Sequence, residues 1–137
     1  MQPGASRGVY NLSRVIRSVL AILLGYAVFA VSAVALFAVG GRDPHSQASA
    51  GFTIIAIAYG ACFGVLAGLV AAWVARRAYF THAFAVGCII ALGAAISLIA
   101  RPGEGAIWTQ LAAMVLFAPL TLLGAHLRSR ISKRVPG

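Results

Sequence analysis

Four long apolar stretches dominate the pattern of hydrophobic and polar residues along the chain. They contain no Asp, Glu, Lys or Arg, are 20 to 24 residues long, and cover 18–40, 51–74, 81–100 and 106–127. An α-helix needs about 20 apolar residues to cross the hydrocarbon core of a bilayer. Strands of membrane barrels are about half as long and alternate apolar with polar residues. The pattern therefore predicts four transmembrane helices.

The connections between these stretches have only five to ten residues. Such short loops make consecutive helices antiparallel neighbours. We expect an all-α polytopic membrane protein whose single domain, 18–127, is an up-down four-helix bundle. The basic tails 1–17 and 128–137 are too short to form a core of their own.

The first stretch also invites comparison with a cleavable signal peptide, because basic residues precede it. Its 23 apolar residues exceed the roughly 7–15 of a typical signal-peptide core. The sequence favours a first membrane helix.

Composition excludes an ordinary water-soluble domain. The chain is 61% hydrophobic and only 9% charged, whereas soluble domains carry about 25% charged residues. Arg far outnumbers Lys, and Ala, Gly and Val are abundant, which hints at a GC-rich bacterial genome and so at a bacterial inner membrane.

The formal net charge of +9 is interpreted as a topology signal. Arg42 and Arg101 fall on one predicted side, with the only two acids, Asp43 and Glu104. The other side holds nine basic residues: Arg7, Arg14, Arg17, Arg76, Arg77, Arg128, Arg130, Lys133 and Arg134. Short cytoplasmic loops are enriched in Lys and Arg, so both termini are expected in the cytoplasm. Because these residues border apolar runs and follow no groove or helix face, we expect no nucleic-acid partner.

Basic residues at the predicted inner ends of the helices are expected to contact anionic lipid headgroups. Each contributes about 1 kcal/mol near the membrane surface. The residues concerned are Arg76, Arg77, Arg128, Arg130, Lys133 and Arg134.

Small residues recur at every fourth position of the second and third stretches. The sets are Ala56, Gly60, Gly64, Gly68 and Ala72, and then Ala83, Gly87, Ala91 and Ala95. Such faces let helix backbones approach closely in lipid. We predict that the two sets face each other in a tight hairpin. The alternatives are a homodimer formed through the glycines, or a polar conduit lined by exposed backbone.

In the fourth stretch, Pro119 removes a backbone donor and is expected to free the Val115 carbonyl and kink the helix. The kink is interpreted as structural, with a transporter hinge as the alternative.

Ionisable residues inside membrane helices usually mark function, but here only His82 and His126 qualify, near the predicted inner ends. They are interpreted as interfacial residues, with a pH-responsive pair as the alternative. Asp43, His45 and Glu104 lack the spacing of a zinc site. Cys62 and Cys88 are expected to pack as small apolar residues at different depths, without a disulfide. We therefore predict no catalytic, cofactor or metal site.

Polar side chains gather in the predicted outer half of the third and fourth stretches, at Ser97, Thr109 and Gln110. A hydrogen bond between Ser97 and Gln110 is the favoured interpretation. A small outward-facing polar pocket formed by the three is the alternative.

The central hairpin resembles small uncharacterised bacterial four-helix inner-membrane protein families. The resemblance lies in the glycine-rich second helix, its ending over 68–77, and His82-Ala83 at the next helix; it implies no activity. Small multidrug exporters have similar size, but the membrane glutamate of their first helix is missing from 18–40. The arginine-containing glycine motif and paired phenylalanines of fluoride channels are not found either.

The leading hypothesis is a non-enzymatic structural or accessory membrane subunit that acts through helix packing. A homodimer or another membrane subunit is the expected protein partner. The alternative function is a small transporter or channel that forms its pathway by oligomerising. A lipid-modifying enzyme fits least, because the chain has so few acids and bases.

Overall fold

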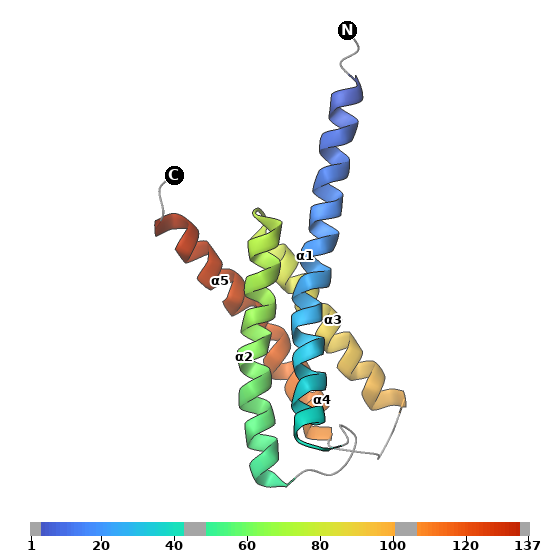
Figure 1. Ribbon diagram of the computed structural model, residues 1–137, viewed down its shortest axis with the longest axis vertical. Helices are drawn as coiled ribbons and strands as arrows, with labels where there is room; N and C mark the ends of the chain where they lie inside the picture. Colours follow the sequence, from blue (N-terminus) through green and yellow to red (C-terminus); the bar gives the residue numbers. More distant parts are fainter. Residues whose placement is uncertain (1–3, 43–48, 101–106, 135–137) are drawn as a thin grey trace.

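The computed structural model describes residues 4–42, 49–100 and 107–134, and side chains within 12–42, 49–100 and 107–133. The described chain is entirely helical apart from short turns (Figure 1). Its elements are α1 (Gly4–Val39), α2 (Ala50–Ala75), α3 (Tyr79–Ala100), α4 (Ile107–Ala112), the π-helical turn η1 (Ala113–Phe117) and α5 (Ala118–Arg134).

Four helical segments are long and apolar enough to span a membrane, which confirms the predicted number. They are Leu12–Val39, Ala50–Ala75, Tyr79–Ala100 and Ile107–Lys133. The fourth combines α4, η1 and α5 into one span. The N-terminal end of α1 and the C-terminal end of α5 lie at the same end of the bundle (Figure 1).

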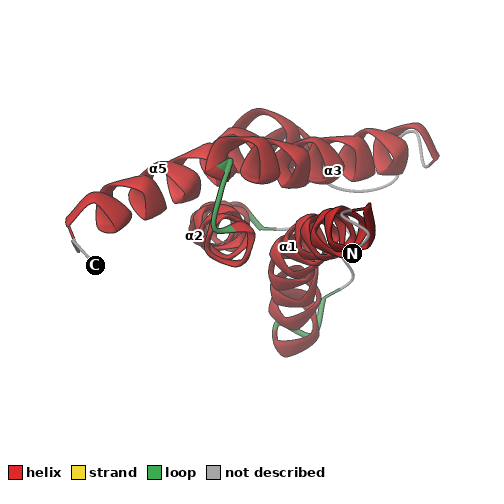
Figure 2. Ribbon diagram, turned by 90° about the horizontal axis from the view of Figure 1, so that it is seen from above, coloured by secondary structure: helices red, strands yellow, loops and turns green. Residues whose placement is uncertain are grey.

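The helices are arranged in two layers. α1 and α2 run side by side in one layer, while α3 and α5 form the other and incline across them (Figures 1 and 2). α2 and α3 each contact both α1 and α5, whereas α1 and α5 do not contact each other in the described chain. The hairpin of α2 and α3 therefore lies between α1 and α5.

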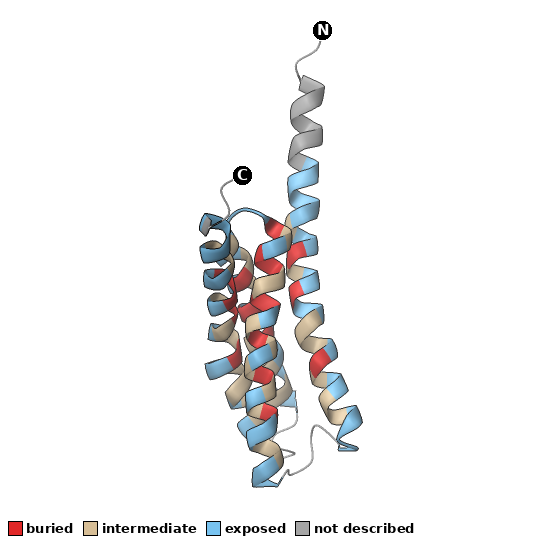
Figure 3. Cartoon of the chain, turned by 60° about the vertical axis from the view of Figure 1, so that its left-hand side comes forward, coloured by how far each residue is buried: buried red, intermediate tan, exposed pale blue. Residues whose placement is uncertain are grey.

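Both basic segments form more helix than expected. α1 begins at Gly4 and α5 continues to Arg134, so the predicted tails 1–17 and 128–137 are largely helical. In α1, Leu12, Val15, Ile16 and Val19 recur at helical spacing, which makes one face apolar. This part of α1 projects beyond the other helices (Figure 3) and is almost entirely exposed.

Turn and capping residues set the end of α1 and the start of α2 near the predicted positions. α1 ends at Gly40-Gly41, where Gly41 has a φ of +58° and the Arg42 N–H donates to the Phe37 carbonyl at 3.1 Å. Glycine adopts this left-handed conformation without a steric penalty. The Ser49 hydroxyl accepts from the Phe52 N–H at 3.4 Å and caps the start of α2.

Pro119 is accommodated by a π-helical turn. Directly before it, η1 runs over Ala113–Phe117, and the Ala118 N–H donates to the carbonyl of Ala113, five residues earlier. Such a turn shifts the register of the side chains that follow it, and π turns recur at functional sites. The sequence predicted a disturbance here but not this form.

The core consists of small residues packed around a few larger ones. One cluster holds Ala67, Ala71, Val86, Ile90 and Phe117, and a second holds Ala72, Ala83 and Ala125. These residues come from the central hairpin, η1 and α5. The interior is therefore formed by helix backbones that lie close together and contains few large side chains.

The prediction that the two sets of small residues face each other holds only near the α2–α3 turn, where Ala72 and Ala83 share a core cluster. Gly60 and Gly64 lie against Phe117, and Gly68 lies against the Thr121 backbone. Gly87 of α3 lies against Ala118 and Thr121 as well. Both sets therefore pack mainly on the fourth span. A run of small residues indicates that another helix approaches closely, but it does not specify which helix.

Candidate functional site

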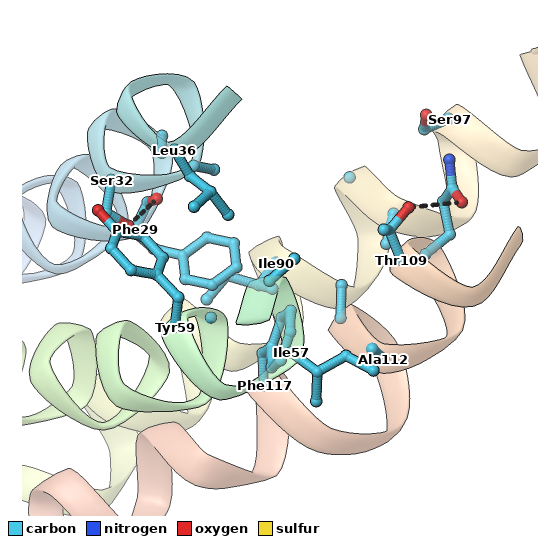
Figure 4. A pocket seen from close by; sticks show the side chains of 18 of the residues that line it. Phe29, Ser32, Leu36, Ile57, Tyr59, Ile90, Ser97, Thr109, Ala112 and Phe117 are labelled. Atoms are coloured by element: carbon cyan, nitrogen blue, oxygen red, sulfur yellow. Dashed lines mark hydrogen bonds between the residues drawn. The ribbon is translucent and has the colours of Figure 1, made fainter. Parts of the chain in front are cut away.

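A cavity of about 290 Å³ lies between all four spans, towards the end of the bundle opposite the described ends of α1 and α5. Most of its lining is apolar and aromatic, including Phe29, Tyr59, Ile90 and Phe117 (Figure 4). Cavities with this kind of lining and a few polar groups are typical of sites for small apolar ligands. We call it the apolar cavity.

Phe117 is the lining residue through which the fourth span contacts both α1 and α2. Its ring centroid lies 5.8 Å from that of Phe29, with the ring planes tilted by 55°. The ring is 7% exposed and fills the space left by Gly60, where an added Cβ would lie 2.5 Å from its Cζ atom. The π turn thus places an aromatic ring where α1 and α2 approach the fourth span.

The three polar residues selected from the sequence all line the apolar cavity. Ser97 comes from α3, and Thr109 and Gln110 come from α4 (Figure 4). The Thr109 hydroxyl donates to the Gln110 amide oxygen at 3.2 Å. The hydrogen bond expected between Ser97 and Gln110 is not found among the described residues. The structure thus brings the three residues to one cavity, although most of its lining is apolar and not polar as the pocket interpretation describes.

Two further hydroxyl groups were missed by the sequence analysis. Ser32 is buried in the wall of the cavity and donates to the Phe29 carbonyl at 2.7 Å. Thr121 is fully buried and donates to the carbonyls of Ala83, at 2.9 Å, and Ala118, at 2.7 Å. The spacing of Phe117, Thr121 and Ala125 along one helix face was a signal that could have identified Thr121.

The small residues selected for helix packing are mostly buried. The five of α2 and the first two of α3 are buried, while Ala91 and Ala95 are half-buried. Two glycines that we had not selected also mark close contacts. Gly25 lies against Ala67 and Ala71, and Gly124 lies against the α2 backbone. The fourth span of the same chain therefore covers the glycines proposed for a homodimer.

The six predicted lipid-contact residues separate into two groups. Arg76, Arg77 and Arg128 line cavities shared with the first half of α1. Arg130 and Lys133 lie further along α5 and line neither of those cavities. Arg134 is the last residue of α5, and its side chain is outside the described part.

The two histidines do not form a pair. His82 Nδ1 lies 3.0 Å from the Ala78 carbonyl oxygen, and Arg130 Nε donates to His126 Nε2 at 3.2 Å. They line different cavities. Each therefore interacts within its own helical segment, which disfavours the alternative of a joint pH-responsive site.

Cys62 and Cys88 are free and exposed, so the expectation that they are packing residues was wrong. Their small, apolar character gave no information on which helix face they occupy. Asp43, His45 and Glu104 lie outside the described residues. Among the residues with described positions, no group of three His, Cys, Asp or Glu could hold a metal ion.

Comparisons with known proteins give no family for this chain. No protein-family model matches it, and neither a curated protein nor a solved structure resembles it significantly. The similarity of the central hairpin to small bacterial four-helix membrane families stays a prediction. The chain is thus placed by its own sequence and structure, as an all-helical protein with four helices long and apolar enough to span a membrane.

Proposed function

We propose that the protein is a non-enzymatic accessory subunit of a bacterial inner membrane, which acts by helix packing with another membrane protein. Both termini face the cytoplasm, because nine of the eleven basic residues belong to that side. The helices carry no charged side chain within the four apolar stretches.

The way in which buried polar groups are used is the main support for this proposal. Thr121 and Ser32, the two buried polar residues of the described chain, donate to backbone carbonyls of neighbouring helical segments or of their own helix. Catalytic or transport groups usually point into a site with their hydrogen-bonding capacity free. The Thr121 hydroxyl instead connects α5 to α3, and the Ser32 hydroxyl bonds within α1, as expected of a structural membrane element.

Assembly in the membrane tests this function. The chain is extracted from its own membrane in mild detergent, and its complexes are weighed by native mass spectrometry. An accessory subunit is expected in a complex of fixed stoichiometry with a different membrane protein. A particle that contains only this chain, both in detergent and in lipid nanodiscs, would contradict the proposal.

A small transporter or channel is the second candidate, and the apolar cavity favours it. The cavity reaches from the centre of the bundle to Ser97, Thr109 and Gln110. None of the described residues that line it is charged, so its chemistry suits an apolar solute better than an ion. A homo-oligomer that moves such a solute across proteoliposomes would support this function, whereas a mixed complex without flux would support the accessory role.

A further inference from the structure

A basic recess lies where the first half of α1 meets the α2–α3 turn and α5. Its cavity of about 740 Å³ is lined by one arginine from each of these three regions: Arg17, Arg76 and Arg128. A second cavity of about 550 Å³ adjoins it and shares Arg17 and Arg76. We use the name basic recess for the two cavities together.

The positive charge in the basic recess is not compensated by the residues around it. The second cavity adds Arg14, Arg77 and the imidazole of His82. None of the described residues in either lining is acidic. Like charges brought together by three separate regions repel one another unless an anion lies between them. Guanidinium groups suit phosphate in particular, because their planar N–H groups bind its oxygens in pairs.

Arg128 supplies a second, independent observation. Its Nε atom is buried and has no hydrogen-bond partner among the described residues. Its guanidinium carbon lies 5.8 Å from the centroid of the Tyr79 ring, which holds the group in place. Since Nε is enclosed by the protein, the other N–H groups of this guanidinium are the ones that a phosphate in the basic recess would meet.

The backbone of the α2–α3 turn presents an arginine where glycine is usual. Arg76 has a φ of 59°, and its N–H donates to the Ala72 carbonyl, so it occupies the position of a helix C-cap. Glycine is favoured in this left-handed conformation because it has no Cβ. The turn therefore accepts an unfavourable residue and brings a guanidinium group to the basic recess.

The larger cavity also has an apolar part of its lining. Ile16, Leu20, Trp73 and Val74 belong to it, and Trp73 is 66% exposed. A ligand that fits both the arginines and these apolar residues carries a phosphate and a hydrocarbon chain. We propose that the basic recess binds an anionic phospholipid, with the phosphate between Arg17, Arg76 and Arg128 and an acyl chain beside Trp73.

This inference requires that the chain spans a membrane, but it is independent of the accessory role. A failure of lipid binding would not contradict the proposed complex with another membrane protein. The absence of a partner protein, in turn, would not contradict the proposed lipid site. The two proposals are therefore tested separately.

Fluorescence quenching tests the site in the full-length protein. The chain has two tryptophans, so Trp108→Phe leaves Trp73 as the only emitter. This protein is reconstituted in phosphatidylcholine vesicles that contain phosphatidylglycerol with brominated acyl chains. Trp73 is expected to be quenched more strongly than by the same fraction of brominated phosphatidylcholine. Equal quenching by the two lipids would overturn the proposal.

A matched pair of variants separates a site from a general surface charge. Arg17→Gln with Arg76→Gln removes two charges from the basic recess together with their charge-assisted hydrogen bonds to the phosphate, and is expected to weaken the preference for phosphatidylglycerol by roughly a hundredfold or more. Arg130→Gln with Lys133→Gln removes the same charge outside it and is expected to lose only the general attraction to the anionic surface, a several-fold smaller effect. Equal losses of this preference in both variants would indicate only a general electrostatic attraction between basic residues and the anionic membrane. That result would overturn the proposed site.

Two further arms complete the experiment. Arg17→Lys with Arg76→Lys keeps the charge and controls for folding, so it is expected to retain most of the preference; loss of the preference in a folded Lys variant would overturn a site based on charge. Inorganic phosphate at millimolar concentration is expected not to relieve the quenching. If it does, the basic recess binds free phosphate, and the assignment to a lipid is overturned.

Discussion

The hydroxyl of Thr121 in α5 lies 2.9 Å from the backbone carbonyl oxygen of Ala83 in α3. The same hydroxyl lies 2.7 Å from the carbonyl of Ala118, one turn earlier in the fourth span, so one proton is shared between two acceptors. Thr121 is completely buried. The contact therefore connects two helices at a position where water cannot replace it.

Thr121→Val is expected to destabilise the folded bundle by about 0.6–2 kcal/mol, because it removes this donor with almost no change of shape. Thr121→Ser keeps the hydroxyl and serves as the control. Chemical unfolding in detergent micelles, followed by circular dichroism, measures the difference. A Val variant as stable as the wild type would show that the hydrogen bond contributes nothing net.

The contact between α2 and α5 predicts a strong effect of side-chain size. A Cβ at Gly68 would clash with the Thr121 carbonyl, and one at Gly124 would clash with the Val65 carbonyl. Backbone atoms cannot move aside easily, so Gly68→Ala is expected to cost at least about 1–3 kcal/mol of unfolding free energy.

Gly93→Ala is the matched control for that change, because no described atom outside its own stretch of helix lies within 4 Å of its added Cβ. It is expected to be neutral or to stabilise α3 by up to about 1 kcal/mol, since Ala favours helix more than Gly does. Thermal unfolding of both variants in the same detergent gives the comparison. If Gly68→Ala and Gly93→Ala behave alike, the close approach of α2 and α5 is wrong.

Phe117 is expected to be the most sensitive aromatic residue. Phe117→Ala enlarges the apolar cavity and removes the ring that contacts Phe29 and Gly60, at a cost of about 3–5 kcal/mol. Phe84→Ala removes a ring that is 60% exposed and is expected to cost much less. The unfolding midpoints of the two variants measure this difference, and equal midpoints would place Phe117 outside the core.

The proposed orientation can be read from thiol labelling. With Cys62 and Cys88 replaced by Ala, single cysteines are placed at Val39, which is 90% exposed, and at Ser132, which is also exposed. A membrane-impermeant maleimide is expected to label Val39→Cys in intact cells and Ser132→Cys only after the inner membrane is opened. The reverse pattern would contradict cytoplasmic termini.

Hydropathy alone predicted the number of spans and most of their limits. The second span was expected over 51–74, and α2 covers Ala50–Ala75. Length, apolar composition and turn residues are local properties, so the sequence reports them directly. The helical extensions towards Gly4 and Arg134 were missed because charged residues interrupt the apolar runs, although the helical spacing continues through them.

Consecutive helices contact one another as predicted, but the faces through which the helices pair were beyond the sequence. The small residues of α2 and α3 indicated close approach, but their partner is the fourth span, whose π turn and Thr121 provide a better complementary surface. Likewise, Ser97, Thr109 and Gln110 could be grouped by depth, whereas the aromatic part of the cavity depends on tertiary contacts of Phe29 and Phe117. Which helix faces pair depends on the shapes of all four helices together, and no single helix sequence specifies it.

The separation of α1 from α5 has a consequence for the order of assembly during synthesis. α1 is translated first, yet Gly25 docks against Ala67, Ala71 and Val86, which leave the ribosome only with the second and third spans. Until then the first helix has no partner within the chain and must be held by the lipid alone. Its long apolar stretch and basic amphipathic start suit this interval. The central hairpin then supplies most of the contacts of α1, and the last span adds the ring contact of Phe117 with Phe29.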